Sequence, residues 1–470
     1  MVAIAPFRAL RYDPARAGDL RAAVAPPYDV ISPEEQEQLH QASPYNIVRL
    51  ILGRQQPDDT DTANRYTRAK HLLADWRASG VLAQDARPAI YLCEQTFAWQ
   101  GETHRRLGFI ALLEFEGSVS PTGTSPPTGT SPGGVLRHEA TFSAPKADRT
   151  KLLDEVQANL SPIFCVVSDP ERVGPDRLAR WAQDHPPLAS FSLPRPESVE
   201  GGRGTGQEQV RLWAVDDAAL IEELRARLAP GRALIADGHH RFEVALSRRH
   251  LAGGVMTFFA WAEDPAVVVR PIHRVIKAGF ASPSGSQDQL ARLCALEPVP
   301  STAALARRLG QAGGQGQFGY YARGQAFLAS VRDEVLAEWL LRPTVPLGLA
   351  GLDVSILHHA LLPRLVGEVA PPARRDTSSS QDRDSLRSLR SPAQMVPPRS
   401  QESDSYCRYT PDGAEAAAAV DRGEGACAWL LRPIPLPQVF ALAEQGLALP
   451  QKSTYFYPKV LSGLCLHPFH

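Results

Sequence analysis

The segment Ala233–Leu246 combines an apolar run with side chains that can bind an anion. It reads ALIADGHHRFEVAL, which predicts a strand that runs into Asp-Gly, followed by a helix that begins at His-His-Arg. Backbone N–H groups at a helix N-terminus attract anions, glycine permits close backbone approach, and arginine can hold two phosphate oxygens. The alternative is a polar turn whose histidines cap the helix. The candidate phosphate-binding residues are Asp237, Gly238, His239, His240 and Arg241.

A second charged cluster, RHEATFSAPKADR, begins at Arg137. Pro145 is expected to end an extended piece, after which a helix starts with two cations one turn apart on the same face. Cations at a helix start oppose the helix dipole, and a bound phosphate between them would relieve that conflict. The alternative is a solvated, charged helix start. The candidate catalytic residues here are His138, Glu139 and Lys146, and Arg149 is a candidate phosphate ligand.

The segment APPYDVISPEE predicts a rigid turn that leads into a helix. Ser32 and Glu35 have the spacing of a capping box, which gives both a structural role. Tyr28 and Asp29 have no such role and are held by the preceding prolines, so they are candidate site residues.

Two further segments could contribute to a site or be merely structural. The stretch LPQKSTYFYPK places hydroxyl groups and two lysines in one extended loop. The stretch RPIHR ends a β-branched strand, Val267–Val269, with a histidine and an arginine. The candidate residues are Lys452, Ser453, Thr454 and Lys459 in the first, and His273 and Arg274 in the second.

Other motif matches are false leads. The G-x-G-x-x-G match at 314–319 follows a polar glycine stretch and overlaps a β-like run, which favours a hairpin or loop over a dinucleotide site. Lys452-Ser453-Thr454 lacks the glycines of a phosphate-binding P-loop. The adjacent histidine pairs at 239–240 and 358–359 are not spaced like zinc ligands.

Strands and helices alternate between these motifs, which predicts a mixed α/β or α+β class. The predicted strands are Asn46–Leu52, Ala89–Gln95, Leu107–Glu114 and Ile163–Val167, with a turn at Gln100-Gly101, and the predicted helices are Asn64–Ser79 and Lys146–Leu160.

Two low-complexity segments predict disordered insertions, because neither can bury enough apolar surface to offset its ordering entropy. A polar stretch at about 196–207 predicts a surface loop. The expected organisation is an N-terminal α/β part at 1–117, an insertion at 118–134, a central part at 135–369, an insertion at 370–404 and a C-terminal part at 405–470 that completes the same domain.

Composition limits the classes of function. The net charge is -1, with 50 basic and 51 acidic residues, which argues against a dedicated nucleic-acid binder. Only six basic residues are lysines, so we expect lysines to persist where arginine cannot replace them. The six cysteines are scattered among apolar neighbours and predict buried free thiols. There is no signal peptide or membrane-spanning run, so a cytoplasmic location is expected.

These segments together resemble a prokaryotic family known only as a domain of unknown function, DUF1015. The residues that carry the resemblance are APPYDVIS (25–32), NIVRLIL (46–52), RHEATFSAPKADR (137–149), NLSPIF (159–164), IADGHHRFE (235–243), PIHR (271–274) and PQKSTYFYPKV (450–460). The Asp-Gly-His-His-Arg piece is also similar to the phosphate-binding signature of the ParB/sulfiredoxin fold.

The resemblance implies a mixed-sheet fold with a ParB/sulfiredoxin-like core, nucleotide binding, and kinship with free-serine kinases that use ATP or ADP. A sulfiredoxin-like role is disfavoured because no cysteine lies beside residues 238–241. A ParB-like DNA clamp is disfavoured by the neutral charge and by the lack of an evident helix-turn-helix.

The leading hypothesis is a nucleotide-dependent phosphotransferase that acts on a small hydroxyl metabolite, with free serine as the best guess and ATP or ADP with Mg²⁺ as cofactor. His239, His240 and Arg241 would hold the nucleotide phosphates, and Asp29 or Glu139 would accept the hydroxyl proton. The alternative is a non-catalytic nucleotide or phosphometabolite-binding regulator. No nucleic-acid or membrane partner is expected, and the oligomeric state stays open. The candidate substrate-binding residues are Tyr28, Asn46, Arg49, His273, Arg274 and Lys459, and the candidate Mg²⁺ ligands are Asp148 and Asp237.

Overall fold

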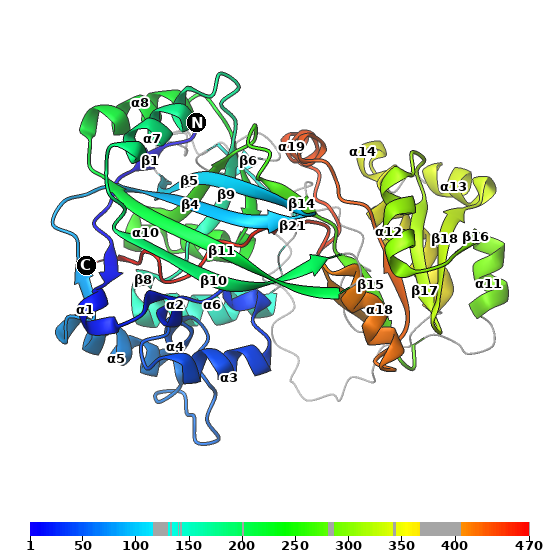
Figure 1. The fold of residues 1–470 in the computed structure, drawn as a ribbon, viewed down its shortest axis with the longest axis horizontal. Coiled ribbons are helices and arrows are strands. Elements are labelled where there is room, and N and C mark those ends of the chain that lie inside the picture. Colours follow the sequence, from blue (N-terminus) through cyan, green and yellow to red (C-terminus); the bar gives the residue numbers. More distant parts are fainter. Residues whose placement is uncertain are drawn as a thin grey trace, which may run out of the picture.

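The computed structural model describes residues 1–115, 130–131, 134–139, 141, 143–199, 202–280, 286–341, 345–366 and 406–469. A large mixed sheet forms the centre of its larger lobe (Figure 1). Across this sheet the strands are β10 (Ala189–Val199), β11 (Gly202–Val215), β4 (Ile90–Trp99), β5 (Glu102–Glu114), β13 (Gly254–Trp261), β9 (Ile163–Val167), β12 (Ala233–Asp237), β7 (Val135–Leu136) and β6 (Thr130–Ser131), and β1 (Ile4–Ala5) pairs with β5. The β13–β9 and β12–β7 pairs are parallel and the other neighbours are antiparallel, which confirms the predicted mixed α/β class.

The two faces of the large sheet pack against different parts of the chain, because successive side chains of a strand point to opposite faces. Ile163, Cys165 and Val167 of β9 belong to a core on one face with helices α7 (Val173–Gln183), α8 (Ala218–Leu228) and α9 (His239–Ser247). Phe164 and Val166 belong to a core on the other face with apolar residues of the C-terminal segment.

Shorter helices from the N-terminal part form a further core with the helix that follows β7. These elements are α1 (Pro14–Ala17), α2 (Leu20–Ala23), the 3-10 turn η1 (Tyr28–Val30), α3 (Pro33–Ala42), α4 (Val48–Ile51), α5 (Arg65–Ala78) and α6 (Ser143–Val156), with the strand pair β2 (Leu10–Tyr12) and β3 (Leu82–Gln84); α10 (Arg249–Ala252) follows α9. The Ser32 side chain accepts the Glu35 N–H and so caps α3, as predicted.

The smaller lobe contains a second sheet (Figure 1). Its strands in spatial order are β16 (Cys294–Val299), β18 (Gln325–Val331), β17 (Gln317–Ala322), β20 (Gly425–Leu430), β15 (His273–Lys277) and β19 (Cys407–Thr410). Its helices are α11 (Ser286–Leu293), α12 (Thr302–Gln311), α13 (Asp333–Leu340), α14 (Leu347–Ala350), α15 (Asp353–Ser355), the π-helix η2 (Ile356–Leu361), α16 (Leu362–Val366) and α18 (Gly413–Asp421), whereas α19 (Leu436–Glu444) contacts β7 of the large sheet. The β17–β18 hairpin confirms the hairpin predicted at the 314–319 glycine motif.

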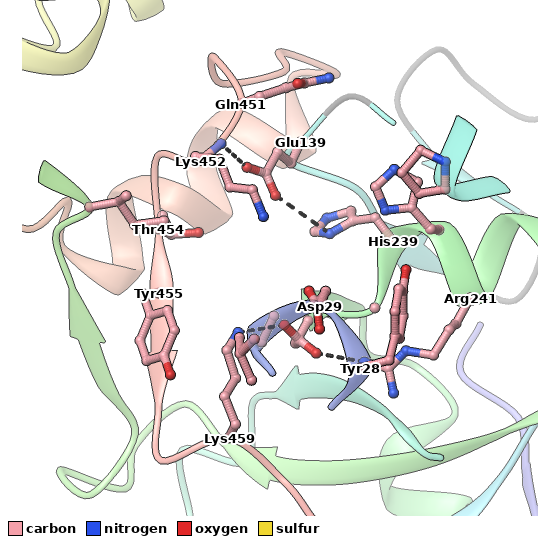
Figure 2. Close-up of a pocket in the computed structure, with 17 residues that line it drawn as sticks. Tyr28, Asp29, Glu139, His239, Arg241, Gln451, Lys452, Thr454, Tyr455 and Lys459 are labelled. Atoms are coloured by element: carbon pink, nitrogen blue, oxygen red, sulfur yellow. Dashed lines mark hydrogen bonds and ion pairs between the residues drawn. The ribbon is translucent and has the colours of Figure 1, made fainter. Parts of the chain in front are cut away.

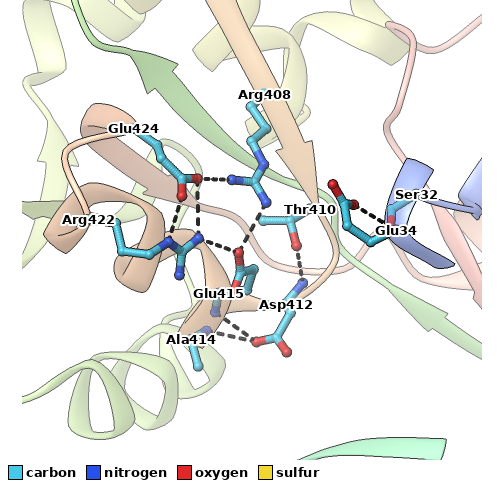
Figure 3. Close-up of polar contacts among 9 residues, drawn as sticks. All are labelled: Ser32, Glu34, Arg408, Thr410, Asp412, Ala414, Glu415, Arg422 and Glu424. Carbon is cyan, nitrogen blue, oxygen red and sulfur yellow. Dashed lines mark hydrogen bonds and ion pairs between the residues drawn. The ribbon is translucent and has the colours of Figure 1, made fainter. Parts of the chain in front are cut away.

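The residues around α18 show how arginines at the surface of this chain are paired. Asp412 caps the helix by accepting the N–H groups of Ala414 and Glu415. Arg408 and Arg422 both bind Glu415 and Glu424 at the surface (Figure 3). These arginines are therefore matched by carboxylates and are not offered to a ligand.

The C-terminal segment returns from the smaller lobe to the large sheet. β21 (Tyr455–Tyr457) pairs with β14 (Val268–Arg270), and β22 (His467–Pro468) pairs with β8 (Ala158–Asn159). Its motif residues therefore lie beside elements that are distant in the sequence.

Several predicted elements are confirmed, including α5, β4, β5, β9, the turn at Gln100-Gly101, and the β12-to-α9 junction. The strand predicted at Asn46–Leu52 is wrong, since Val48–Ile51 is helical. The apolar residues there are all buried, so no alternation distinguishes a strand from a helical turn.

Three boundaries also differ from the prediction. Helix α6 begins at Ser143, so Pro145 lies in its first turn, where its missing N–H costs no hydrogen bond. The surface loop predicted at 196–207 is wrong, because β10 and β11 form a hairpin there, with β10 at the sheet edge, where proline is tolerated. His273 and Arg274 begin β15 instead of ending the preceding strand.

The predicted insertion at 370–404 lies outside the described residues, as does most of the one predicted at 118–134, of which Thr130–Ser131 forms β6. The six cysteines are buried and free, as predicted. In the described ranges, no helix has the length and apolarity that a membrane crossing requires.

Candidate functional site

Five separate chain segments line one cavity of about 290 Å³ in the larger lobe (Figure 2). They are the η1 turn, Glu139 with the start of α6, the junction of β12 and α9, Ile272 between β14 and β15, and the returning C-terminal segment. The residues lining the cavity are Tyr28, Asp29, Val30, Glu139, Pro145, Ala236, Asp237, Gly238, His239, His240, Arg241, Ile272, Gln451, Lys452, Thr454, Tyr455 and Lys459.

The β12–α9 junction is built around Gly238. Its φ of +91° lies in the left-handed region, and a Cβ atom there would lie 2.9 Å from the Ile163 side chain. Glycine is therefore required for the strand to turn into α9 at this point. The turn brings the first residues of α9, and with them the N-terminal end of the helix dipole, to the cavity wall.

Asp237 holds two cations at the cavity. Arg241 Nη2 lies 2.6 Å from its carboxylate, and Lys459 Nζ binds the other carboxylate oxygen (Figure 2). Burial alone would raise the pKa of Asp237, but the charges of Lys459 and Arg241 outweigh it and hold that pKa below its usual range. Burial opposes the charged form of Lys459 as well, yet Asp237 raises the pKa of this lysine. Both groups are therefore ionised at neutral pH.

Glu139 connects the C-terminal segment to α9. Its carboxylate accepts the backbone N–H of Lys452 and lies 4.0 Å from His239 Nδ1 (Figure 2). Desolvation raises the pKa of Glu139, although the nearby Lys452 acts in the opposite direction. Glu139 thus fixes the position of Lys452.

The two histidines behind Glu139 are neutral. Burial lowers the pKa of His138 to about 4 and lowers that of His239 well below its ordinary value. The rings pack edge to face at 4.8 Å, and His138 Nε2 lies 2.9 Å from Thr454 Oγ1. His239 Nε2 is buried with no hydrogen-bond partner among the described residues. Burial also lowers the pKa of His240.

Two charged groups in the cavity are left for a ligand. Within the part of the chain that the structure describes, Lys452 Nζ makes no ion pair and the Asp29 carboxylate makes neither a hydrogen bond nor an ion pair. Lys452 also has a φ of +55°, which costs a side-chain-bearing residue backbone strain. Strain of this kind at a cavity wall is typical of functional residues.

The structure places eleven of the candidate residues in the cavity. They are Tyr28, Asp29, Glu139, Asp237, Gly238, His239, His240, Arg241, Lys452, Thr454 and Lys459. Lys146 lies nearby, where its ammonium is 3.0 Å from Glu243 of α9, and His138 lies behind Thr454.

The other candidates do not line this cavity, and each has structural partners. Asn46 Nδ2 donates to the carbonyls of Ala22 and Val24, and Arg49 donates to those of Ser43 and His40. Ser453 donates to the Pro450 carbonyl. His273 Nδ1 accepts the Leu431 N–H, and Arg274 donates to His358 and Ile272.

The two aspartates predicted to hold Mg²⁺ do not fit that role. Both carboxylate oxygens of Asp237 are engaged by Lys459 and Arg241. Asp148 is bound by Arg65, Tyr66 and Arg149 and does not line the cavity. No group of three or more histidine, cysteine or acidic residues suited to a metal occurs in the described ranges.

Sequence reasoning missed six residues of the lining: Val30, Pro145, Ala236, Ile272, Gln451 and Tyr455. All six lie inside the motifs already singled out, so their signal was membership of a motif. Ile272 alternates with His273, whose side chain points away to Leu431, and only the tertiary fold reveals which of the two reaches the cavity.

A family model described as "Protein of unknown function (DUF1015)" matches residues 4–355. The matched range includes the cavity residues from Tyr28 to Ile272 and ends before Gln451–Lys459. A search of curated proteins finds no match.

Solved structures with a similar chain course include a free serine kinase in complex with AMP, at 11% identity and a TM-score of 0.32, over 69% of this chain and 83% of that chain. A conserved hypothetical protein from Pyrococcus furiosus is similar at 11% identity and a TM-score of 0.31, over 70% of this chain and 89% of that one. SbnI with a C-terminal truncation, from Staphylococcus aureus, is similar at 8% identity and a TM-score of 0.32, over 75% and 85%. At these identities and TM-scores, the similarity of the chain to the solved structures does not indicate an activity.

Proposed function

We propose that this chain, which belongs to the DUF1015 family of proteins of unknown function, is a nucleotide-dependent phosphotransferase that acts on a small hydroxyl metabolite. Family membership names no activity, so the proposal rests on the cavity. The observation that carries this proposal is the joint presence of three cations, three carboxylates and the N-terminus of α9 on one cavity wall. Phosphoryl transfer needs these two kinds of group, since cations stabilise the phosphates and a carboxylate takes the proton of the attacking hydroxyl.

The cations have different roles in this proposal. Arg241 and Lys459 are held rigidly by Asp237, so they present fixed positive charge to the phosphates without reorganising. Lys452 makes no ion pair with any described residue, and it would bind the transferred phosphoryl group directly. The N–H groups at the start of α9 add further donors.

The proton acceptor would be Asp29. Its carboxylate lines the cavity and makes no hydrogen bond or ion pair with the described residues, whereas the Glu139 carboxylate is engaged by the Lys452 N–H. We therefore assign Glu139 to positioning Lys452 and Asp29 to removing the hydroxyl proton. The nucleotide would be ATP or ADP, and no residue of the chain is assigned to Mg²⁺.

The test is turnover of ATP or ADP with Mg²⁺ and a panel of hydroxyl amino acids, with free serine first, measured by ³¹P NMR of the phosphorylated product. A phosphorylated acceptor that forms with wild-type protein and not with Lys452→Ala supports the proposal. A nucleotide-induced thermal shift without turnover would instead identify a nucleotide-binding regulator. No shift and no turnover would refute both functions.

A further inference from the structure

A second, smaller cavity of about 60 Å³ lies next to the first and shares two residues with it, Tyr28 and Arg241. The other residues that line it are Ile51, Arg149, Leu152, Leu153, Ala158, Asn159, Leu160, Ser161, Val244 and Ala245. A ligand that passes Tyr28 and Arg241 would therefore extend from one cavity into the other.

Most residues that line the second cavity are apolar, and they come from α6, α9, the end of α4 and the chain that follows α6. Its guanidinium at Arg149 is already engaged, because it donates to Asp148 and to the Ile51 carbonyl and lies 3.9 Å from the centre of the Tyr28 ring. The second cavity thus lacks the free charge that a phosphate would need. Its volume is several times the ~10–15 Å³ that a cavity needs to hold one water molecule, so it admits a group larger than water.

Two donors at this cavity have no acceptor. Asn159 Nδ2 and Arg241 Nε are buried without a hydrogen-bond partner among the described residues. Asn159 is only 7% exposed, so bulk water does not satisfy its amide. Buried donors are nearly always paired in folded proteins, and an unpaired one beside a cavity indicates an absent acceptor.

We infer that the second cavity binds the nucleobase of the nucleotide whose phosphates occupy the first. A base supplies a flat apolar ring for the walls and ring acceptor atoms for the Asn159 amide, while its ribose and phosphates pass Tyr28 and Arg241. This inference rests on the proposed function and adds that the base, and not only the phosphate chain, is recognised.

The experiment compares ADP with pyrophosphate by isothermal titration calorimetry of the full chain. The affinity for pyrophosphate measures binding to the first cavity alone. The additional affinity for ADP measures the contribution of the second cavity. We expect wild-type protein to bind ADP at least tenfold more tightly than pyrophosphate. Leu153→Trp, which places a bulkier side chain in the wall of the second cavity, should abolish this difference and leave pyrophosphate binding unchanged.

Leu72→Trp is the matched control, because Leu72 is also a half-buried helical leucine but lines neither cavity. It should bind both ligands like wild type. Asn159→Ala is a second variant that removes the donor without filling the cavity, and it should weaken ADP binding about tenfold with pyrophosphate binding unchanged.

Equal affinity for ADP and pyrophosphate, or a Leu153→Trp protein that binds ADP as tightly as wild type, would overturn the inference and leave the proposed function standing. Binding of neither ligand would overturn the proposed function itself.

Discussion

At the scale of single residues, the scarcity of lysine proves informative in part. Two of the six lysines, Lys452 and Lys459, supply two of the three cations in the cavity. Lys70 makes an exposed ion pair with Glu155, and Lys151 is exposed, so retention of lysine does not by itself identify a site. Occurrence within a motif is not sufficient either, because Lys146 lies in a motif but pairs with Glu243 and does not line the cavity.

Replacing Asp29 tests its proposed role as proton acceptor. In Asp29→Asn the cavity keeps its shape and its cations but loses the base, so turnover should fall about 10²- to 10⁴-fold while nucleotide affinity changes little. Steady-state kinetics and calorimetry on the same preparation measure the two effects. Asp58→Asn, an exposed control, should behave like wild type. An Asp29→Asn protein with full turnover would return the role of base to Glu139.

Removing the Lys452 ammonium should weaken binding itself. Lys452→Ala should lower the affinity for ADP and for pyrophosphate alike, by about 10- to 100-fold, because a charge-assisted hydrogen bond to phosphate is lost. Calorimetry measures both, with the exposed Lys151→Ala as the matched control. Unchanged pyrophosphate binding in Lys452→Ala would show that this ammonium does not face the phosphates.

At the scale of elements, the sequence predicted those helices, strands and turns that are determined by local residue patterns. The β12-to-α9 junction was predictable because an apolar strand, a glycine that must adopt positive φ and a helical pattern follow one another directly. Helix α4 was not, because all its apolar residues are buried and carry no period. Nor did local sequence reveal that Arg149 packs on the Tyr28 ring and donates to the Ile51 carbonyl, since both contacts are made by the tertiary fold.

The junction between β12, α9 and the C-terminal segment is also a stabilising one. Lys459→Met would leave the buried Asp237 carboxylate with Arg241 alone, so the free energy of unfolding at pH 7 should fall by about 3 kcal/mol. Urea denaturation measures this, and Lys70→Met, which breaks an exposed pair, should cost less than about 1 kcal/mol.

The same variant should alter the acid dependence of stability. The folded pKa of Asp237 lies below its unfolded value of about 3.9, so its contribution is present above that pH and is lost as the pH falls through the folded pKa. Lys459→Met should therefore lose less stability than wild type between pH 5 and pH 3. An equal loss in both proteins would mean that Lys459 does not lower this pKa.

At the scale of the whole molecule, the site depends on chain ends that meet in space. The cavity needs Tyr28 from the N-terminal part, His239 from the centre and Lys459 from the C-terminal segment. That segment is fixed at several points, through the β21–β14 and β22–β8 pairs and the Leu10–Leu466 bridge. The order of the motifs along the sequence could not reveal this convergence, because the pairs join residues that are hundreds of positions apart.

Buried histidines in both lobes make the free energy of unfolding depend on pH. Burial lowers the pKa of His40, His138 and His467 to about 4 and that of His273 to about 3. Unfolding returns these groups to about 6.5, so between pH 6.5 and pH 4 the unfolded chain binds more protons than the folded one. Stability should therefore fall steadily as the pH drops through this range.

His273 offers the sharpest test of this coupling, because its neutral ring accepts the buried Leu431 N–H. His273→Asn keeps an acceptor and removes the titration, so the slope of unfolding free energy against pH should decrease by about 1.4 kcal/mol per pH unit between pH 6 and pH 4. Urea denaturation at several pH values gives this slope. His185→Asn, at an exposed position, should keep the wild-type slope. A His273→Asn protein with the wild-type slope would show that His273 is not held neutral by burial, because lower stability alone would leave the slope unchanged.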